Sequence, residues 1–276
     1  MKTLFWSLLG ALSWLQQTRA DIAPFIGYLQ REAHKPTITL VKLANKILRY
    51  ARRVKSGIVY RKLVPPLRLV TVADSAYKAN DDLTDCIALR GYIILVVGQS
   101  SAKNRKLNDG SSTAGHSPGG PCFVLDWVSK KFNVITRSSF CAELRNQIEA
   151  AQTSVHLASA LEENFEAIES PHDLRHRQDQ GLLRIPIYLC GDNKGVFTAT
   201  TAQNPKTPAE PTLTAHVKSL REFLDRGHIR KLLWLDNRDM VADPLTKGKT
   251  KRNELNDVLD QGQWTVSHLP DCWPKT

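Results

Sequence analysis

Residues 185–193 read Ile-Pro-Ile-Tyr-Leu-Cys-Gly-Asp-Asn, a short apolar run that ends in Gly191, Asp192 and Asn193. A run of this length, bounded by turn-forming residues, is typical of a buried strand. The stretch therefore predicts a strand over 185–190 that continues into Asp192. Its neighbours along the chain indicate the class of fold to which this strand belongs.

The predicted elements on the two sides of this strand follow different orders. Three strands come first, at 67–72 (running on to Asp74), 86–97 and 122–127, and a long helix follows over 139–167. After residue 190 come a helix over 213–224, a strand over 229–235 and a helix opened by Asp243-Pro244. Consecutive strands favour an antiparallel meander, and strands separated by helices favour parallel pairing. We therefore expect an α/β fold with a mixed five-stranded sheet and flanking helices.

Two stretches within this pattern, and one after it, lack apolar periodicity. Residues 98–120 are rich in Ser, Gly, Asn and Lys and predict an exposed loop insertion. Residues 204–211 contain three prolines and predict a second loop. Residues 249–276 are polar apart from Trp264 and Trp273, and the pattern assigns this tail to no element.

Residues 1–63 form a separate, strongly basic segment. Apolar periodicity predicts three helices over 3–17, 21–33 and 37–55, and Pro65-Pro66 marks the end of the segment. The segment holds twelve Lys and Arg residues but only two acids, so it carries about +10 of the net charge of +11. An unbalanced positive charge of this size indicates a polyanionic partner, nucleic acid before membrane.

The third predicted helix concentrates this charge on one face. At about 100° per residue, four cations form a narrow stripe opposite an apolar face. The stripe is Lys42, Lys46, Arg49 and Arg53, and the apolar face is Leu40, Ala44, Ile47, Ala51 and Val54. A solvated charged face is the alternative, but no acid balances the stripe. We therefore predict that it contacts the phosphate backbone of nucleic acid.

Residues 1–20 also resemble a secretory signal, with Lys2 before an apolar run and a cleavage-like Thr18-Arg19-Ala20. Polar residues interrupt the run, no N-x-S/T sequon is present, and the five cysteines are odd in number and widely spaced. The competing interpretation is a buried amphipathic helix with Leu4, Leu8, Leu12 and Leu15 on one face. We favour the helix and expect a cytoplasmic or nuclear protein that spans no membrane.

Four acids lie at the ends of predicted elements. Asp74 ends the first strand, Glu143 lies near the start of the long helix, Asp192 follows the strand over 185–190, and Asp243 begins the last helix. Each has an ordinary structural explanation as a turn, a cap or a first-turn acid. A functional site is indicated only if all four converge.

Several motifs resemble the C-terminal part of a copia-type retrotransposon Pol polyprotein, where the end of the reverse transcriptase precedes a ribonuclease H domain. They occur in family order over about residues 8–248: Gly10–Leu15 with Thr18–Ala23, Leu48–Tyr50 with Gly57–Tyr60, Ala73–Tyr77, Trp127–Lys131 with Ser138-Ser139 and Ala142-Glu143, Cys190–Asn193, and Ala242–Lys247. Their shared order makes the resemblance specific. It implies a thumb-like end of the polymerase over 1–63, a ribonuclease H-like domain over 64–248, and a tail over 249–276.

The resemblance implies that Asp74, Glu143, Asp192 and Asp243 are catalytic carboxylates and the ligands of two Mg²⁺ ions, with Mn²⁺ as a substitute. Two ions held by hard oxygen ligands can activate a water and stabilise the leaving oxygen of a phosphodiester. The implied activity is hydrolysis of the RNA strand of an RNA–DNA hybrid. The implied partners are nucleic acid and the upstream reverse transcriptase region of the polyprotein.

Some residues depart from the family pattern. The first motif reads Asp74-Ser-Ala-Tyr77 in place of Asp-Ala-Asp-Trp, Cys141 replaces a common acid, and Met240-Val241 replace Asn-Pro. None of these changes removes an implied ligand, but they leave open a catalytically decayed or domesticated nucleic-acid-binding fragment. No Tyr-x-Asp-Asp motif is present, so we expect no polymerase active site, and the chain resembles a fragment of a longer polyprotein.

Overall fold

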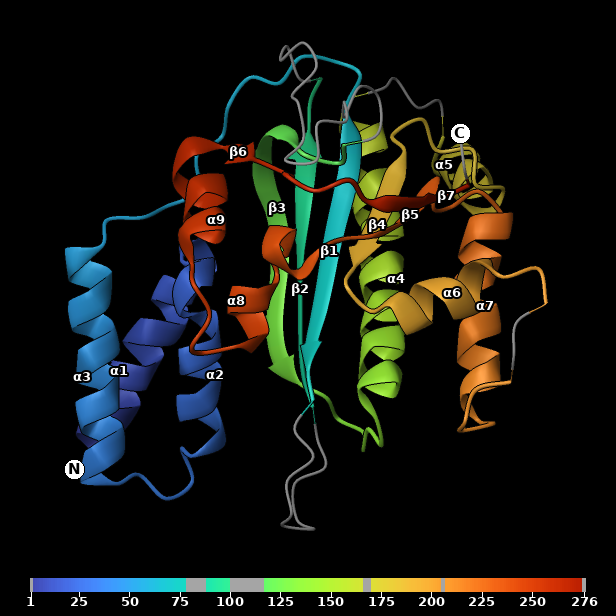
Figure 1. The fold of residues 1–276 in the computed structure, drawn as a ribbon. Coiled ribbons are helices and arrows are strands. Elements are labelled where there is room, and N and C mark those ends of the chain that lie inside the picture. The colour runs from blue at the N-terminus through green and yellow to red at the C-terminus, as the bar shows by residue number, and fades with distance from the viewer. Residues whose placement is uncertain (1, 78–87, 100–116, 166–169, 205–206, 275–276) are drawn as a thin grey trace.

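A mixed β-sheet lies at the centre of the computed structural model, which describes residues 2–77, 88–99, 117–165, 170–204 and 207–274. Among these residues the sheet has seven strands in the order β6-β3-β2-β1-β4-β5-β7 (Figure 1). The strands are β1 (Arg68–Ala76), β2 (Leu89–Val97), β3 (Gly120–Lys131), β4 (Ile187–Gly191), β5 (Lys231–Trp234), β6 (Gln263–Trp264) and β7 (Asp271–Trp273).

The strand directions follow from the connections between the strands. No helix is described between β1 and β2 or between β2 and β3, and these three strands pair antiparallel. Helical connections precede β4 and β5, and β1-β4 and β4-β5 pair parallel. The predicted α/β class, with a meander followed by parallel additions, is thus confirmed. The predicted number of five strands is wrong, because β6 and β7 add two antiparallel strands at the edges.

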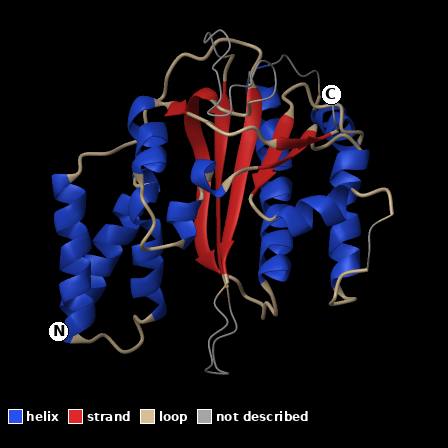
Figure 2. Cartoon of the chain, in the orientation of Figure 1, coloured by secondary structure: helices blue, strands red, loops and turns tan. Residues whose placement is uncertain are grey.

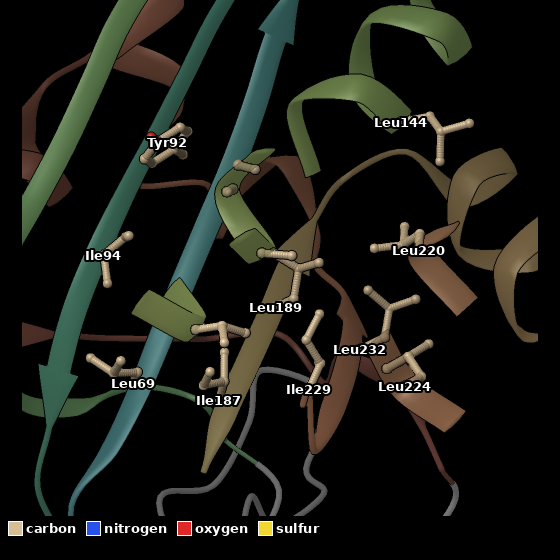
Figure 3. Packing of buried hydrophobic residues seen from close by; sticks show 14 of the residues in the cluster. Leu69, Tyr92, Ile94, Leu144, Ile187, Leu189, Leu220, Leu224, Ile229 and Leu232 are labelled. Atoms are coloured by element: carbon tan, nitrogen blue, oxygen red, sulfur yellow. The ribbon is translucent and has the colours of Figure 1, made fainter. Parts of the chain in front are cut away.

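The alternation of side chains along the strands separates two hydrophobic cores. On one face, Leu69 and Ile94 pack with residues of the long helix α4 (Ser139–Phe165), including Leu144, and of α7 (Leu213–Asp225) (Figure 3). On the other face, Val70 and Ile93 pack against the C-terminal part of the chain. Both faces of β1 and β2 are therefore buried, which explains why these strands read as continuous apolar runs.

Helices cover both faces of the sheet (Figure 2). The helices α5 (Pro171–Asp179) and α6 (Lys194–Thr201) accompany α4 and α7, and neither was expected from the sequence. Both are short, and each is started by a polar cap rather than by a long apolar stripe. Ser170 accepts from the N–H of Asp173, and Asn193 accepts from the N–H of Val196.

The basic segment folds into three helices with their own core: α1 (Lys2–Leu15), α2 (Ala23–Arg31) and α3 (Ile38–Arg53). Thr37 caps α3 as its position predicts, accepting from the N–H of Leu40. The predicted buried face of α1 is partly wrong, because Leu4 is 56% exposed and the buried residues are Phe5, Leu9 and Leu12. Their spacing of four and three residues is as helical as that of the leucines, so periodicity alone could not choose between the two faces.

Residues 249–274 of the tail are described, and they contribute two strands to the sheet. After the short helices α8 (Asp243–Thr246) and α9 (Asn253–Asn256), the chain crosses from β6, paired with β3, to β7, paired with β5 (Figure 1). Trp264 is 1% exposed and belongs to the second core. These strands are two and three residues long, too short for an alternating pattern to be visible in the sequence.

Two predictions about loops and membranes are only partly covered by the structure. The predicted loop over 98–120 connects β2 to β3, and its residues 100–116 lie outside the described part of the chain. No helix among the described residues combines the length and apolarity needed to cross a bilayer. The predicted domain boundaries at 63 and 248 stay predictions.

Candidate metal centre

Three of the four predicted acids converge at one end of the central strands. Asp74 comes from β1, Glu143 is the fifth residue of α4, and Asp192 follows β4. One carboxylate oxygen from each lies within 4.8 Å of the other two. Asp74 is 1% exposed, Glu143 is 4% exposed and Asp192 is half-buried, so the group is not a solvated acidic surface.

The strand register explains how Asp74 and Asp192 meet. The parallel strands β1 and β4 pair with Val72 opposite Cys190. Asp74 and Asp192 each follow two residues after this pair, so they lie at the same height along the two strands. The carboxyl ends of parallel strands share one edge of a sheet, which is where sites in such folds are built. The pairing therefore places Asp192 at the same edge of the sheet as Asp74.

Gly91 allows the last helix to reach the same edge. It lies opposite Asp74 on β2, and a Cβ added there would come 2.7 Å from Thr246 Cγ2 and 2.9 Å from Leu245 Cβ. Only a glycine leaves room for α8 to pack this closely over β2. The close approach places Asp243 and the residues after it beside Asp74.

Glu143 is held on one side and lacks a partner on the other. Its Oε1 accepts from the N–H of Ser75 at 2.9 Å, while its Oε2 is buried without a hydrogen-bond partner among the described residues. Burial, together with the charges of Asp74 and Asp192, raises the pKa of Glu143 well above its usual range. A buried acceptor with no donor is costly, so a cation at this oxygen would stabilise the site.

Asn146 fixes α4 to the strands one turn beyond Glu143. Its Nδ2 donates to the carbonyls of Asp74 at 2.8 Å and of Gly91 at 2.9 Å. One amide thus bridges β1 and β2 next to the carboxylates, and it sets the position of Glu143 relative to Asp74.

The Asp192 carboxylate does not cap the helix that follows it, α6. The neighbouring Asn193 caps α6, while Trp234 Nε1 donates to the Asp192 carbonyl at 2.7 Å. The Asp192 carboxylate therefore points into the cluster. Burial, followed by the charge of Asp74, raises the pKa of Asp192 to about 6. Burial and the neighbouring negative charge of Asp74 both disfavour the ionised form of Asp192.

The fourth acid, Asp243, reaches the cluster through a lysine. Lys247 Nζ lies 2.9 Å from Asp243 Oδ1 and 3.1 Å from Asp74 Oδ1. Asp243 does not cap its helix, because Ala242 is the capping residue and no side chain makes the bond. Burial and Asp74 raise the pKa of Asp243. Burial favours the neutral form of Lys247, but Asp74 and Asp243 outweigh it and raise its pKa.

Thr246 and Lys247 are the functional-site residues that sequence reasoning missed. Thr246 Oγ1 donates to Asp74 Oδ2, and Lys247 is the ion-pair partner of two acids. The only local signal was the spacing of Asp243 and Lys247, four residues apart in a motif already noted. Their contact with Asp74 spans more than 170 positions, and no local pattern reports it.

The residues present fit a hard divalent cation. Three carboxylates, those of Asp74 and Glu143 buried and that of Asp192 half-buried, offer oxygen ligands. Glu143 Oε2, which has no hydrogen-bond partner among the described residues, marks a place where a positive charge would be stabilising. Oxygen-only donors of this kind suit Mg²⁺ or Mn²⁺ rather than Zn²⁺, for which cysteine or histidine would be expected.

The cationic stripe of α3 is exposed as predicted. Lys42, Lys46, Arg49 and Arg53 all face solvent. On the opposite face, Leu40, Ala44 and Ile47 are buried, and Ala51 and Val54 are half-buried. The division of the helix into a packed and a charged face is therefore correct, while the contact with phosphate stays a prediction.

Comparisons with known proteins agree with the sequence resemblance. No protein-family profile matches the chain. The Retrovirus-related Pol polyprotein from transposon RE1 of Arabidopsis thaliana is 25% identical over 252 residues, and that from transposon RE2 is 22% identical over 245 residues. Each match covers 89% of this chain but 14% of the relative, so the chain spans a small part of these polyproteins. The predicted resemblance to a retrotransposon Pol polyprotein is confirmed.

Ribonuclease H1 from the halophilic archaeon Halobacterium salinarum NRC-1 is among the solved structures to which the chain is similar. The match covers 58% of this chain and 78% of that one, with 17% identity and a TM-score of 0.30. A score this low supports no argument about the fold or the activity.

Proposed function

We propose that this chain is the ribonuclease H-like part of a retrotransposon Pol polyprotein and hydrolyses the RNA strand of RNA–DNA hybrids with a divalent metal ion. The observation that carries the proposal is the meeting of Asp74, Glu143 and Asp192 within 4.8 Å, with the first two acids buried and the third half-buried. Four separate elements of the chain deliver these acids and Asp243 to one place, which ordinary caps and turns would not require.

Each carboxylate has a part in holding the ion. Asp74, Glu143 and Asp192 would bind it, and Asp243 would contribute charge from the opposite side, through Lys247. When bound, a divalent ion supplies an activated water and stabilises the leaving oxygen of a phosphodiester. Asn146 and Thr246 keep Asp74 oriented, since the first binds its carbonyl and the second its carboxylate.

Binding of the substrate is assigned to the basic helical segment. The exposed cations of α3 would contact phosphates, which position a duplex without reading its sequence. Selection of the RNA strand would require contacts to the 2′-hydroxyl. The upstream polymerase region would be the covalent partner that delivers the hybrid.

The test is cleavage of a labelled RNA–DNA hybrid by the full chain. We expect cleavage of the RNA strand with Mg²⁺ or Mn²⁺ and none with chelator. Asp192→Asn should lower kcat more than about 100-fold, since even residues outside a ligand set cost 10- to 100-fold when changed. The matched control is Asp179→Asn, because Asp179 is exposed at the end of α5.

Two results would contradict the proposal. Full activity in Asp192→Asn would remove the assigned site. Tight hybrid binding by the wild type without any cleavage in either metal would favour the alternative, a nucleic-acid-binding fragment that has lost catalysis.

A further inference from the structure

The carboxylate cluster has two unlike sides. On one side, Glu143 Oε2 lies buried next to Asp192 and has no donor within the described part of the chain. On the other side, both oxygens of Asp74 already have partners, because Oδ1 accepts from Lys247 and Oδ2 accepts from Thr246. Only the first side therefore lacks a cation.

The second side is filled by one ammonium shared between two acids. Lys247 Nζ lies 3.1 Å from Asp74 and 2.9 Å from Asp243, so it bridges carboxylates from β1 and α8. A divalent ion that linked the same two acids would have to occupy the space the ammonium now takes. Lys247 follows α8 directly, four residues after Asp243. Thr246, the last residue of α8, holds this part of the chain to Asp74 by a hydrogen bond.

Repulsion between cations favours the same arrangement. A second divalent ion bound by Asp74 and Asp243 would lie next to the ammonium that already contacts both acids, and the two cations would repel each other. A lysine is suited to this place, because its compact ammonium can donate to more than one carboxylate at once.

We propose that Lys247 takes the place of a second metal ion, so that the site binds one divalent cation, on the side of Glu143 and Asp192. The inference rests on the proposed metal centre and revises the two ions implied by the sequence resemblance. In it, Lys247 is the resident cation of Asp74 and Asp243, and the divalent ion is held by Asp74, Glu143 and Asp192.

The experiment counts bound Mn²⁺ on the full chain without nucleic acid, by the loss of the electron paramagnetic resonance signal of the free ion. We expect one bound ion in the wild type and two in Lys247→Met, where the space between Asp74 and Asp243 is vacated. Lys249→Met is the matched control, because Lys249 is exposed two residues away, and it should bind one ion. Lys247→Arg keeps the positive charge and should also bind one.

Other numbers of bound ions would contradict either the role of Lys247 or the metal centre. Two ions in the wild type, falling to one in Asp243→Asn, would show that the lysine does not exclude the second ion. This measurement does not depend on Lys247→Met being folded. One ion in both the wild type and a folded Lys247→Met would show that the space does not bind a metal. No bound ion in the wild type would refute the metal centre itself, and with it the proposed function.

Discussion

Asp74 is the residue that joins the two sides of the site. Its carbonyl is fixed by Asn146, and its carboxylate is shared by Thr246 and Lys247. Residues of α4 and of α8 with the residue that follows it thus constrain the backbone and the carboxylate of Asp74, so the direction of the carboxylate is set before any ion or substrate binds. Such preorganisation is what a metal-binding carboxylate needs, because a free rotor would lose entropy on binding.

The pKa of Asp192 predicts how stability changes with pH when no metal is present. Burial and Asp74 raise this pKa to about 6 in the folded chain, above the value of about 3.9 expected when unfolded. A raised pKa means that the folded state binds the proton more tightly. Its contribution to stability is therefore complete below about pH 4 and is lost as the pH rises through 6.

Asp192→Asn, which cannot ionise, should therefore gain stability relative to the wild type as the pH rises from 4 to 8. The expected gain is about 3 kcal/mol, from a shift of about two pKa units at about 1.4 kcal/mol each. Urea unfolding in chelator at both pH values measures it. Adding Mg²⁺ at pH 8 should stabilise the wild type and not the variant. A difference between the two proteins that does not change with pH would contradict the assignment.

At the scale of elements, the sequence predicted what apolar pattern can report. The long buried runs identified β1, β2 and α4, and the stripe of α3 separated its packed residue Ile47 from its exposed residue Lys46. The short helices α5 and α6 were not predicted, because their polar caps, Ser170 and Asn193, mark them more clearly than any apolar periodicity does.

The same limit explains which parts of the site could be predicted. Asp74 and Asp192 were found because each follows an apolar strand, a local signal. Lys247 was missed because its role is created by contact with Asp74, far away in the chain. The resemblance to Pol polyproteins pointed to the motif that contains Lys247, but it implied a ligand only for Asp243.

The stripe of α3 predicts how nucleic-acid binding responds to salt. Each phosphate contact releases counterions and contributes about −0.9 to the slope of log K against log salt concentration. Changing Lys42, Lys46, Arg49 and Arg53 together to Gln should flatten this slope by roughly 3 to 4 for a duplex. Affinity for the hybrid should fall without a change in sequence preference, because phosphates carry no sequence information.

Binding titrations at several salt concentrations test this prediction. The control changes four exposed cations elsewhere to Gln, namely Arg175, Lys218, Arg226 and Arg230. Folding should survive in the α3 variant, because the packed residues of the helix are untouched and Gln is a good helix former. A slope equal to that of the wild type would show that the stripe is only a solvated face.

At the scale of the whole molecule, the C-terminal tail supplies the two edge strands of the sheet, β6 and β7. The second core combines strands of the centre, the α8 region that carries Asp243, and the tail around Trp264. The helical segment joins this assembly at Asp21, whose carbonyl accepts from Arg252 at 3.2 Å and whose carboxylate pairs with the buried Arg19. The tail therefore supports the layer that positions the fourth acid and its lysine.

Trp264 provides the test of this architecture. It is 1% exposed, and its backbone carbonyl lies 2.7 Å from where a Cβ on Gly119 would be, so β6 packs closely on the start of β3. Trp264→Ala should lower the free energy of unfolding by about 3–5 kcal/mol, the usual cost of removing a large buried aromatic. Trp14→Ala, at a residue that is 71% exposed, should change it by about 0.5 kcal/mol or less. Urea unfolding of the three proteins gives the comparison, and equal small effects at both positions would show that the tail contributes nothing to the fold.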